Sequence, residues 1–257
     1  MLLTIDVGNT LTDLGIFEGE KLISTYKTKS DPDKSYEEYQ AIVALYLQTH
    51  GLSAKDIHGA ILSSVVPSLT RIWSKICLDV FLTKPLVVGP HLKTGLPINA
   101  DHPNEVGSDL VADAVGALHR YGPACVIVDL GTANKVILLD KEGAFSGVSI
   151  GPGFKISIDA LVENTAALPE VSLLPPKSVI GRNTEDAMNS GMIYGTAYSV
   201  RGLADAFEKE CGYYLKRILT GGNAPYVKDV LSDFTYDEWL LLEGLRLIAL
   251  KNGKIRL

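Results

Sequence analysis

The sequence predicts an α/β protein built from two similar halves, each a mixed sheet flanked by helices. Near the N-terminus, an apolar strand-like run ends in Asp6 and a small polar turn, and a second strand-like run follows. The same pattern of strand, acidic turn and strand returns at Asp129, 123 residues further along the chain. Because a repeat of this kind in a chain of 257 residues indicates related domains, we expect one domain at 1–118 and another at 119–257.

The first half has three strand patterns, over 3–7, 14–17 and 21–23, followed by alternating helices and strands. Ser35 and Glu38 form a capping-box pattern, which indicates where the first helix begins. The later elements expected in this half are a helix ending near Gly51, a strand over 59–66, a helix from Pro67, a strand over 85–88 and a helix ending near Tyr121.

The second half repeats the order of the first half, with three strands before its helices. The elements expected there are strands over 124–129, 136–139 and 144–150, a helix over 155–164, a long helix capped by Thr184, a strand over 215–220 and a last helix from about Asp237. The long helix carries Gly191, Gly195 and Gly202 on a slim face. Such a face predicts close helix packing, either within the chain or across a dimer.

Composition argues against several classes of protein. The net charge is −6 and no basic block is present, so nucleic acid is not an expected partner. No apolar run reaches the roughly 20 residues that span a bilayer, and no basic leader precedes the first strand, so no membrane association is expected. The three cysteines are far apart in sequence, which favours a reducing, cytoplasmic compartment.

The two acidic turns have the chemistry of a phosphate site. Glycine permits close approach of a ligand to the backbone, the amides and hydroxyls of Asn9 and Thr10 can bind phosphate oxygens, and Asp6 can hold a hydrated cation. Two such turns facing each other across a cleft would bracket a polyphosphate. This arrangement resembles that of the superfamily of actin, the sugar kinases and the heat-shock ATPases, with its paired ribonuclease H-like domains and its active site between them.

Two further features are open to a structural or a functional interpretation. Asp109 lies at or near a helix N-terminus, where a carboxylate serves either as a cap or as a general base. Gly221 and Gly222 follow a strand, and they form either a simple strand-to-helix turn or a contact with a nucleotide.

An ordered set of short motifs along almost the whole chain resembles the type III pantothenate kinase family. The motifs are Asp6-Val7-Gly8-Asn9-Thr10, Thr94-Gly95-Leu96-Pro97, Glu105-Val106-Gly107-Ser108-Asp109, Asp129-Leu130-Gly131-Thr132-Ala133, Pro152-Gly153, Thr165-Ala166, Gly181 with Asn183-Thr184, Ser190-Gly191 and Thr220-Gly221-Gly222. The resemblance implies a homodimeric enzyme that phosphorylates pantothenate with ATP in the first step of coenzyme A biosynthesis. It also implies a divalent metal such as Mg²⁺ and a monovalent cation, K⁺ or NH₄⁺.

The resemblance also implies roles for individual residues. Asp109 would be the general base, Asp129 would bind the monovalent cation, and Asp6 would hold the divalent cation through water. The ATP-binding residues would be Asp6, Val7, Gly8, Asn9, Thr10, Leu11, Thr12, Asp13 and Thr132. The pantothenate site would be lined by Gly107, Ser108, Asp109, Leu110 and Thr184.

The chain departs from the family pattern near the expected site. Leu110 replaces an Arg, and Asn134-Lys135 replaces Thr-Thr. Ala100 replaces a Tyr, and Val148 replaces a Gly. Losing an Arg that could pair with a substrate carboxylate weakens anion recognition. A second hypothesis is therefore a diverged paralogue that phosphorylates another small alcohol, or binds nucleotide or ligand without turnover.

Overall fold

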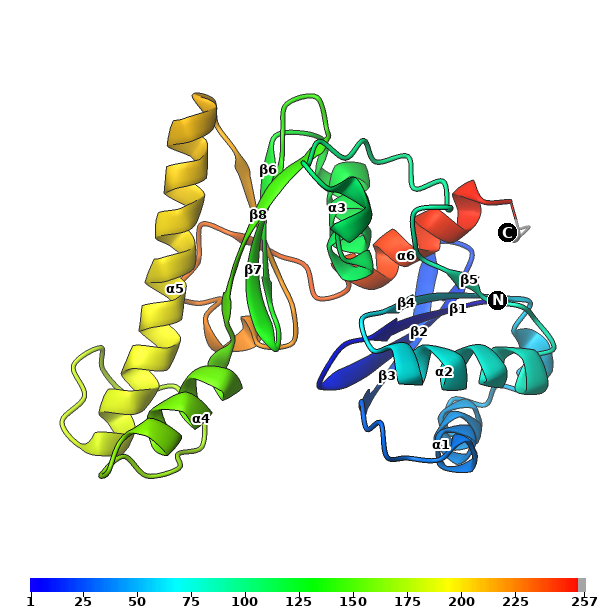
Figure 1. Ribbon diagram of the computed structural model, residues 1–257, viewed down its shortest axis with the longest axis horizontal. Coiled ribbons are helices and arrows are strands. Elements are labelled where there is room, and N and C mark those ends of the chain that lie inside the picture. Colours follow the sequence, from blue (N-terminus) through cyan, green and yellow to red (C-terminus); the bar gives the residue numbers. More distant parts are fainter. Residues whose placement is uncertain (254–257) are drawn as a thin grey trace. The chain divides into compact units, whose positions relative to one another are not determined.

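The computed structural model describes residues 1–253, and in it the chain forms two compact units (Figure 1). Unit 1 contains residues 1–96, 101–116 and the C-terminal segment from 240, whereas unit 2 contains residues 97–100 and 117–239. One change of unit falls between residues 116 and 117. The last helix, however, belongs with unit 1 and not with the second half of the chain.

Unit 1 has a mixed five-stranded sheet in the order β3-β2-β1-β4-β5. Its strands are β1 (Leu2–Val7), β2 (Leu11–Glu18), β3 (Lys21–Lys29), β4 (Gly59–Ser64) and β5 (Leu86–Val87). The first three strands are antiparallel, and β4 then runs parallel to β1 after a helical crossover. The carboxyl ends of β1 and β4 consequently lie at the same edge of the sheet.

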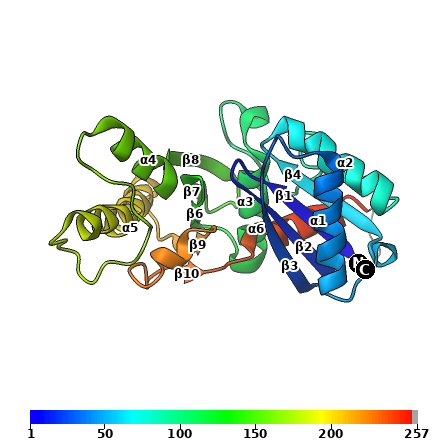
Figure 2. The same cartoon turned by 90° about the horizontal axis from the view of Figure 1, so that it is seen from below.

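Helices cover both faces of this sheet. α1 (Tyr36–Thr49) and α2 (Pro67–Val80) cover one face and α6 (Leu240–Lys251) covers the other, and the first half of α3 (Ser108–Tyr121) packs against α6. Alternate residues of β1, namely Leu3, Ile5 and Val7, join a core with buried residues of α1 and α2, which lie next to each other (Figure 2). The other face of β1 and β4 packs against α6. The side chain of Asp6 therefore lies on the α6 face, because side chains alternate along a strand.

The capping box predicted for α1 is confirmed. The Ser35 hydroxyl accepts a hydrogen bond from the Glu38 amide at 3.2 Å, and the Glu38 carboxylate accepts one from the Ser35 amide at 2.7 Å. This local signal fixes the start of the helix independently of tertiary packing.

Unit 2 repeats the topology of unit 1. Its strands are β6 (Cys125–Leu130), β7 (Ala133–Leu139), β8 (Phe145–Pro152), β9 (Lys216–Thr220) and β10 (Thr235–Tyr236), in the sheet order β10-β9-β6-β7-β8. The first three are antiparallel and β9 is parallel to β6, as β4 is to β1. The prediction of two similar halves, each with a mixed sheet, is confirmed by this correspondence.

The helices of unit 2 are α4 (Phe154–Asn164), the long α5 (Thr184–Cys211) and the last residues of α3. Ile193, Ala197 and Val200 of α5 pack with Val126 and Val128 of β6 in one core. Because Asp129 alternates with these valines, its side chain lies on the face of the sheet away from α5. The N-cap of α5 is Asn183, whose side chain accepts a hydrogen bond from the Asp186 amide, and not Thr184 as predicted.

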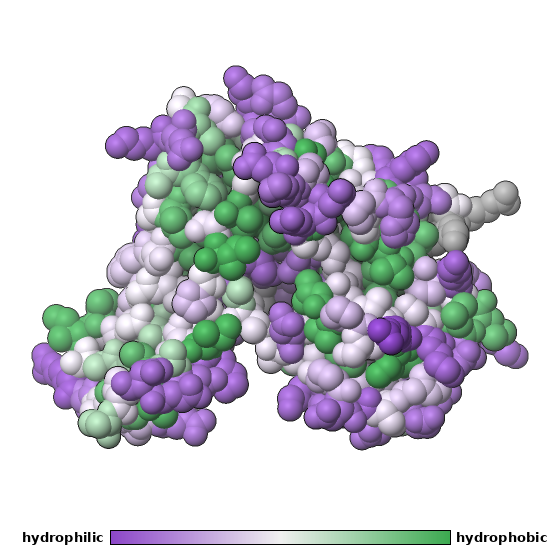
Figure 3. All heavy atoms as spheres, in the orientation of Figure 1, coloured by the Kyte–Doolittle hydropathy of each residue, from purple (hydrophilic) through white to green (hydrophobic). Residues whose placement is uncertain are grey.

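Hydrophilic side chains alternate with smaller hydrophobic areas on the face drawn in Figure 3. Among the described residues, no helix is both long enough and apolar enough to cross a bilayer. The three cysteines are free thiols, two of them buried.

Candidate active site

The turn between β1 and β2 is short and closed by its own backbone. The Gly8 amide donates to the Leu11 carbonyl at 3.0 Å, and Val7 and Thr12 face each other across the two strands. Asn9 and Thr10 are exposed at the tip. The Thr12 hydroxyl is buried and hydrogen-bonded to the Ser30 hydroxyl at 2.8 Å, so this turn is anchored to the end of β3.

Two carboxylates lie side by side below this turn. Asp6 on β1 and Asp13 on β2 are directly opposite in the register, so their side chains share one face of the sheet. Lys27 of β3 lies 3.3 Å from the Asp13 carboxylate. Mg²⁺ is commonly held by one or two carboxylates together with substrate phosphates, and the oxygen donors here fit that requirement. No group of three or more His, Cys, Asp or Glu side chains able to hold a metal occurs among residues 1–253.

The N-terminus of α3 is joined to the same edge of the unit 1 sheet. Asp6 is opposite Ser63 at the end of β4, and the Ser63 hydroxyl is 3.0 Å from the hydroxyl of Ser108, the first residue of α3. Ser63 thus connects the end of β1, beside the β1–β2 turn, with Ser108, the residue before Asp109. It was not predicted from the sequence, although a buried serine ending an apolar strand is the signal that marks it.

Asp109 lies in the first turn of α3, as predicted. Its Oδ1 accepts a hydrogen bond from the Leu110 amide at 2.9 Å, and the Val111 amide donates to the Gly107 carbonyl at 3.1 Å. The side chain of Leu110 is buried, so this residue offers the site its backbone and not a functional group.

The turn between β6 and β7 in unit 2 is held from two sides. The Asn223 side chain donates to the Gly131 carbonyl at 2.9 Å, and the Gly153 amide donates to the Thr132 carbonyl at 3.1 Å. Thr132 itself is exposed. Asn223, like Ser63, was missed in the sequence because its partner is 92 residues away.

Asp129 lies at the end of β6 and forms an ion pair with Lys135 of β7. The Lys135 Nζ is 2.6 Å from the Asp129 Oδ2, and the two side chains are only 17% and 10% exposed. Gly221 follows β9 and packs against the same carboxylate: a Cβ added there would lie 2.4 Å from the Asp129 Oδ1. The Gly221 backbone has φ +95°, which glycine adopts readily. The proposal that Asp129 binds a free monovalent cation stays a prediction.

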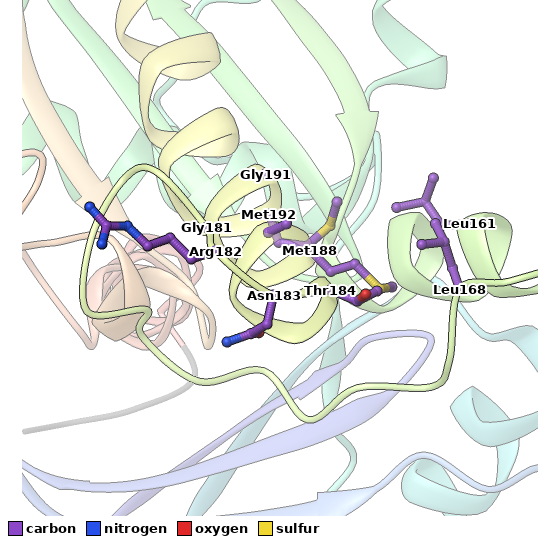
Figure 4. Close-up of a pocket in the computed structure, with 10 residues that line it drawn as sticks. Leu161, Leu168, Gly181, Arg182, Asn183, Thr184, Met188, Gly191 and Met192 are labelled. Carbon is purple, nitrogen blue, oxygen red and sulfur yellow. The ribbon is translucent and has the colours of Figure 1, made fainter.

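Thr184 opens α5 at the edge of a pocket of about 600 Å³ in unit 2 (Figure 4). Leu161 of α4 and Leu168 lie on one side of this pocket, and Met188 and Met192 of α5 also line it. The pocket is mostly apolar, with the Thr184 hydroxyl among its few polar groups. Such a surface can accept the apolar part of a small molecule while a few polar groups fix its orientation.

Comparison with known proteins identifies the family. The family model of type III pantothenate kinase matches residues 2–206. A type III pantothenate kinase from Geobacillus kaustophilus (strain HTA426) is 38% identical over 255 residues, which is 98% of each chain. The chain belongs to the type III pantothenate kinase family.

Solved structures confirm that this family member has the fold of the actin and sugar kinase superfamily. A structure described as a 2-dehydro-3-deoxygalactonokinase protein from Sinorhizobium meliloti matches all of this chain and 98% of its own, with a TM-score of 0.62 and 13% identity. The activator of the 2-hydroxyisocaproyl-CoA dehydratase from Clostridium difficile, with bound ADPNP, covers 98% of this chain and 93% of its own, with a TM-score of 0.53 and 13% identity. At this level of identity, the similarity concerns the fold alone.

The departures of this pantothenate kinase family member from the expected pattern lie in both units. Leu110 is buried in unit 1, and Lys135 is paired with Asp129 in unit 2. The Asn134 side chain donates to the Pro152 carbonyl at 2.9 Å and so joins β7 to β8 beside the second turn. Val148 is half-buried on β8. Asn134 and Lys135 are therefore held by specific contacts in the fold.

Proposed function

We propose that this chain transfers the γ-phosphoryl group of ATP to the primary hydroxyl of pantothenate, giving 4′-phosphopantothenate, the first step of coenzyme A biosynthesis. The observation that carries the proposal is the 38% identity to a type III pantothenate kinase over 98% of both chains. Kinase family membership supports ATP as the phosphoryl donor. The retained acidic turns, each closed by backbone hydrogen bonds, support the same activity.

In this proposal, the residues from Asp6 to Asp13 bind the ATP phosphates, together with Thr132 of the second turn. Exposed amides and hydroxyls at Asn9 and Thr10 donate to phosphate oxygens. A Mg²⁺ ion held by Asp6 through water would offset the charge of the β- and γ-phosphates. The lysine beside Asp13 adds a positive charge at the same edge of the sheet.

We propose that Asp109 is the general base. The substrate hydroxyl gives its proton to the Asp109 carboxylate as its oxygen attacks the γ-phosphorus, and the bond from that phosphorus to the β,γ-bridging oxygen breaks to release ADP. The hydrogen bond from the Leu110 amide holds one oxygen of this carboxylate in the first turn of α3 and leaves the other oxygen to accept the proton. The Ser63–Ser108 hydrogen bond keeps the start of α3 at the edge where β1 ends.

We propose that pantothenate contacts the backbone from Gly107 to Leu110 and the hydroxyl of Thr184. The apolar pocket beside Thr184 supports the assignment of Thr184, because pantothenate carries a gem-dimethyl group next to its reactive end. The homodimer expected from the family fits the exposed glycine and tyrosine residues of α5, such as Gly195 and Tyr198. The three free thiols fit a reducing, cytoplasmic compartment.

The second candidate is the diverged paralogue, and the observation that favours it is the buried Leu110 in place of a guanidinium. The experiment measures ATP turnover in the presence of pantothenate. ADP release gives the rate, and mass spectrometry identifies the product. Pantothenol, which lacks the carboxylate, is the matched alternative acceptor. Formation of phosphopantothenate supports the kinase, whereas ATP binding without phosphorylation of pantothenate favours the paralogue.

A further inference from the structure

The ion pair between Asp129 and Lys135 is part of the framework of the second turn. The two residues are directly opposite each other on β6 and β7, so the hairpin register itself brings their side chains together. The Nζ–Oδ2 distance is 2.6 Å and both side chains are largely buried. Such short, charge-assisted contacts are stronger than neutral hydrogen bonds.

The second oxygen of the Asp129 carboxylate also has a close neighbour. The backbone of Gly221 approaches so closely that even a methyl group there would lie 2.4 Å from Oδ1. Thr220, the residue before it, is directly opposite Asp129 on the parallel strand β9. The carboxylate is therefore enclosed by an ammonium group on one oxygen and by backbone at the other.

A free monovalent cation does not fit this arrangement. To bind Asp129, it would have to displace the Lys135 ammonium, which is covalently tethered and always present at a high local concentration. The displaced ammonium would then be a largely buried charge without its carboxylate, and separating a buried pair in this way is strongly unfavourable. The lysine group also matches an ammonium ion chemically, as a compact point charge with several donors.

We propose that the Lys135 ammonium is the built-in cation of the phosphate-binding turn of unit 2, so that catalysis by this chain needs no added K⁺ or NH₄⁺. The proposal rests on the proposed kinase function, because the positive charge is required where ATP brings further negative charge next to Asp129. Lys135 is thus a positioning residue, which holds Asp129 and neutralises it.

The test begins with the unmodified full chain. Phosphorylation is measured at constant ionic strength in tetramethylammonium, potassium or ammonium chloride, and the three rates should agree within about twofold. A rate that rises tenfold or more when K⁺ or NH₄⁺ replaces tetramethylammonium would overturn the proposal.

Two variants of Lys135 separate its charge from its volume. Lys135→Thr removes the ammonium and leaves room for an ion, so its rate should fall at least tenfold in tetramethylammonium and recover in ammonium or potassium chloride. Lys135→Met removes the charge but fills the space, so its rate should stay low in every salt. Lys75→Thr, which breaks an exposed ion pair with Asp79 in unit 1, is the control and should behave like the unmodified chain.

The dissociation constant of ATP, measured by calorimetry in the same three salts, gives a readout independent of turnover. This dissociation constant should be the same in all three salts for the unmodified chain. For Lys135→Thr, it should be lower in K⁺ or NH₄⁺ than in tetramethylammonium. If no protein turns over pantothenate, the proposed function fails while this binding comparison still decides the role of Lys135. If a variant does not fold, the salt comparison on the unmodified chain decides it. Full activity of Lys135→Met would also overturn the proposal.

Discussion

Replacing Asp109 by Asn tests whether this carboxylate is a base or only stabilises the first turn of α3. Loss of a general base lowers a rate by roughly 10²–10⁴-fold. At about 1.4 kcal/mol for each factor of ten, this is roughly 3–6 kcal/mol on the activation barrier. Asp109 is the second residue of α3 and not its N-cap, and its side chain accepts a hydrogen bond from an amide of the first turn. Removing such an acceptor costs about 0.5–1.5 kcal/mol of stability.

The structure makes the two effects separable. The Asp109 Oδ1 accepts the Leu110 amide at 2.9 Å, and the side-chain oxygen of Asn can accept the same hydrogen bond. Asp109→Asn should therefore reduce kcat by at least 100-fold and change the free energy of unfolding by less than about 1 kcal/mol. Asp109→Ala should lose both activity and stability.

The assays are steady-state phosphorylation of pantothenate and urea unfolding followed by circular dichroism. Glu37→Gln removes an acidic charge from the first turn of α1 and is the matched control, with an expected kcat within twofold of the unmodified chain. A fall of less than tenfold in kcat for Asp109→Asn would refute the assignment of Asp109 as the general base. A large loss of stability in the same variant would show that the carboxylate has a structural role.

Three other perturbations address stability. Gly244→Ala should destabilise unit 1 by more than about 1 kcal/mol, because the added Cβ would lie 1.8 Å from a backbone oxygen of α3. In Gly202→Ala, in α5, the added Cβ meets no atom within 4 Å, so this variant should be more stable by about 0.4–1 kcal/mol. Urea unfolding midpoints measure both changes. The guanidinium of Arg246 binds the buried carboxylate of Glu243 through two contacts of 2.7 and 2.8 Å. Glu243→Gln breaks this ion pair, and thermal unfolding should show a loss of stability of roughly 3–5 kcal/mol. Replacing both residues by apolar residues should restore the stability. Burial raises the pKa of the Cys77 thiol from 9.0 to about 12, so the folded state keeps a proton that the unfolded state loses. Stability should therefore fall by about 1.4 kcal/mol per pH unit above pH 9 from this thiol, and a flat urea midpoint between pH 8 and 10.5 would contradict the argument.

Local signals in the sequence were sufficient to predict most helices and strands and the repeat of their order in the two halves. The capping box at Ser35, the proline that opens α2 and the two acidic turns each depend on neighbours within a few residues. The equivalent topology of the two sheets follows from the repeated order of their elements. The same local signals favoured Thr184 over Asn183 as the cap of α5, because both residue types cap helices and they are adjacent.

Long-range partners were not predictable from the same signals. The Ser63–Ser108 contact joins residues 45 apart, and the Asn223–Gly131 contact joins residues 92 apart. The Asp129–Lys135 pair is the instructive case, because both residues were identified in the sequence and only the hairpin register shows that they meet. The roles expected for Asp6, Thr132 and Thr184 stay predictions, to be tested on the ATP and pantothenate kinetics.

The position of α6 has a consequence for how the protein is made. Unit 1 takes its sheet from the first residues of the chain and one covering helix from the last, so the ribosome must finish nearly the whole chain before that face of the sheet is covered. Unit 2 is almost continuous in sequence and can complete its core earlier in synthesis. Chains that stop before residue 240 would expose the face of β1 and β4 that α6 covers. Cellular quality control would therefore meet truncated products with an open core in unit 1 but a closed one in unit 2.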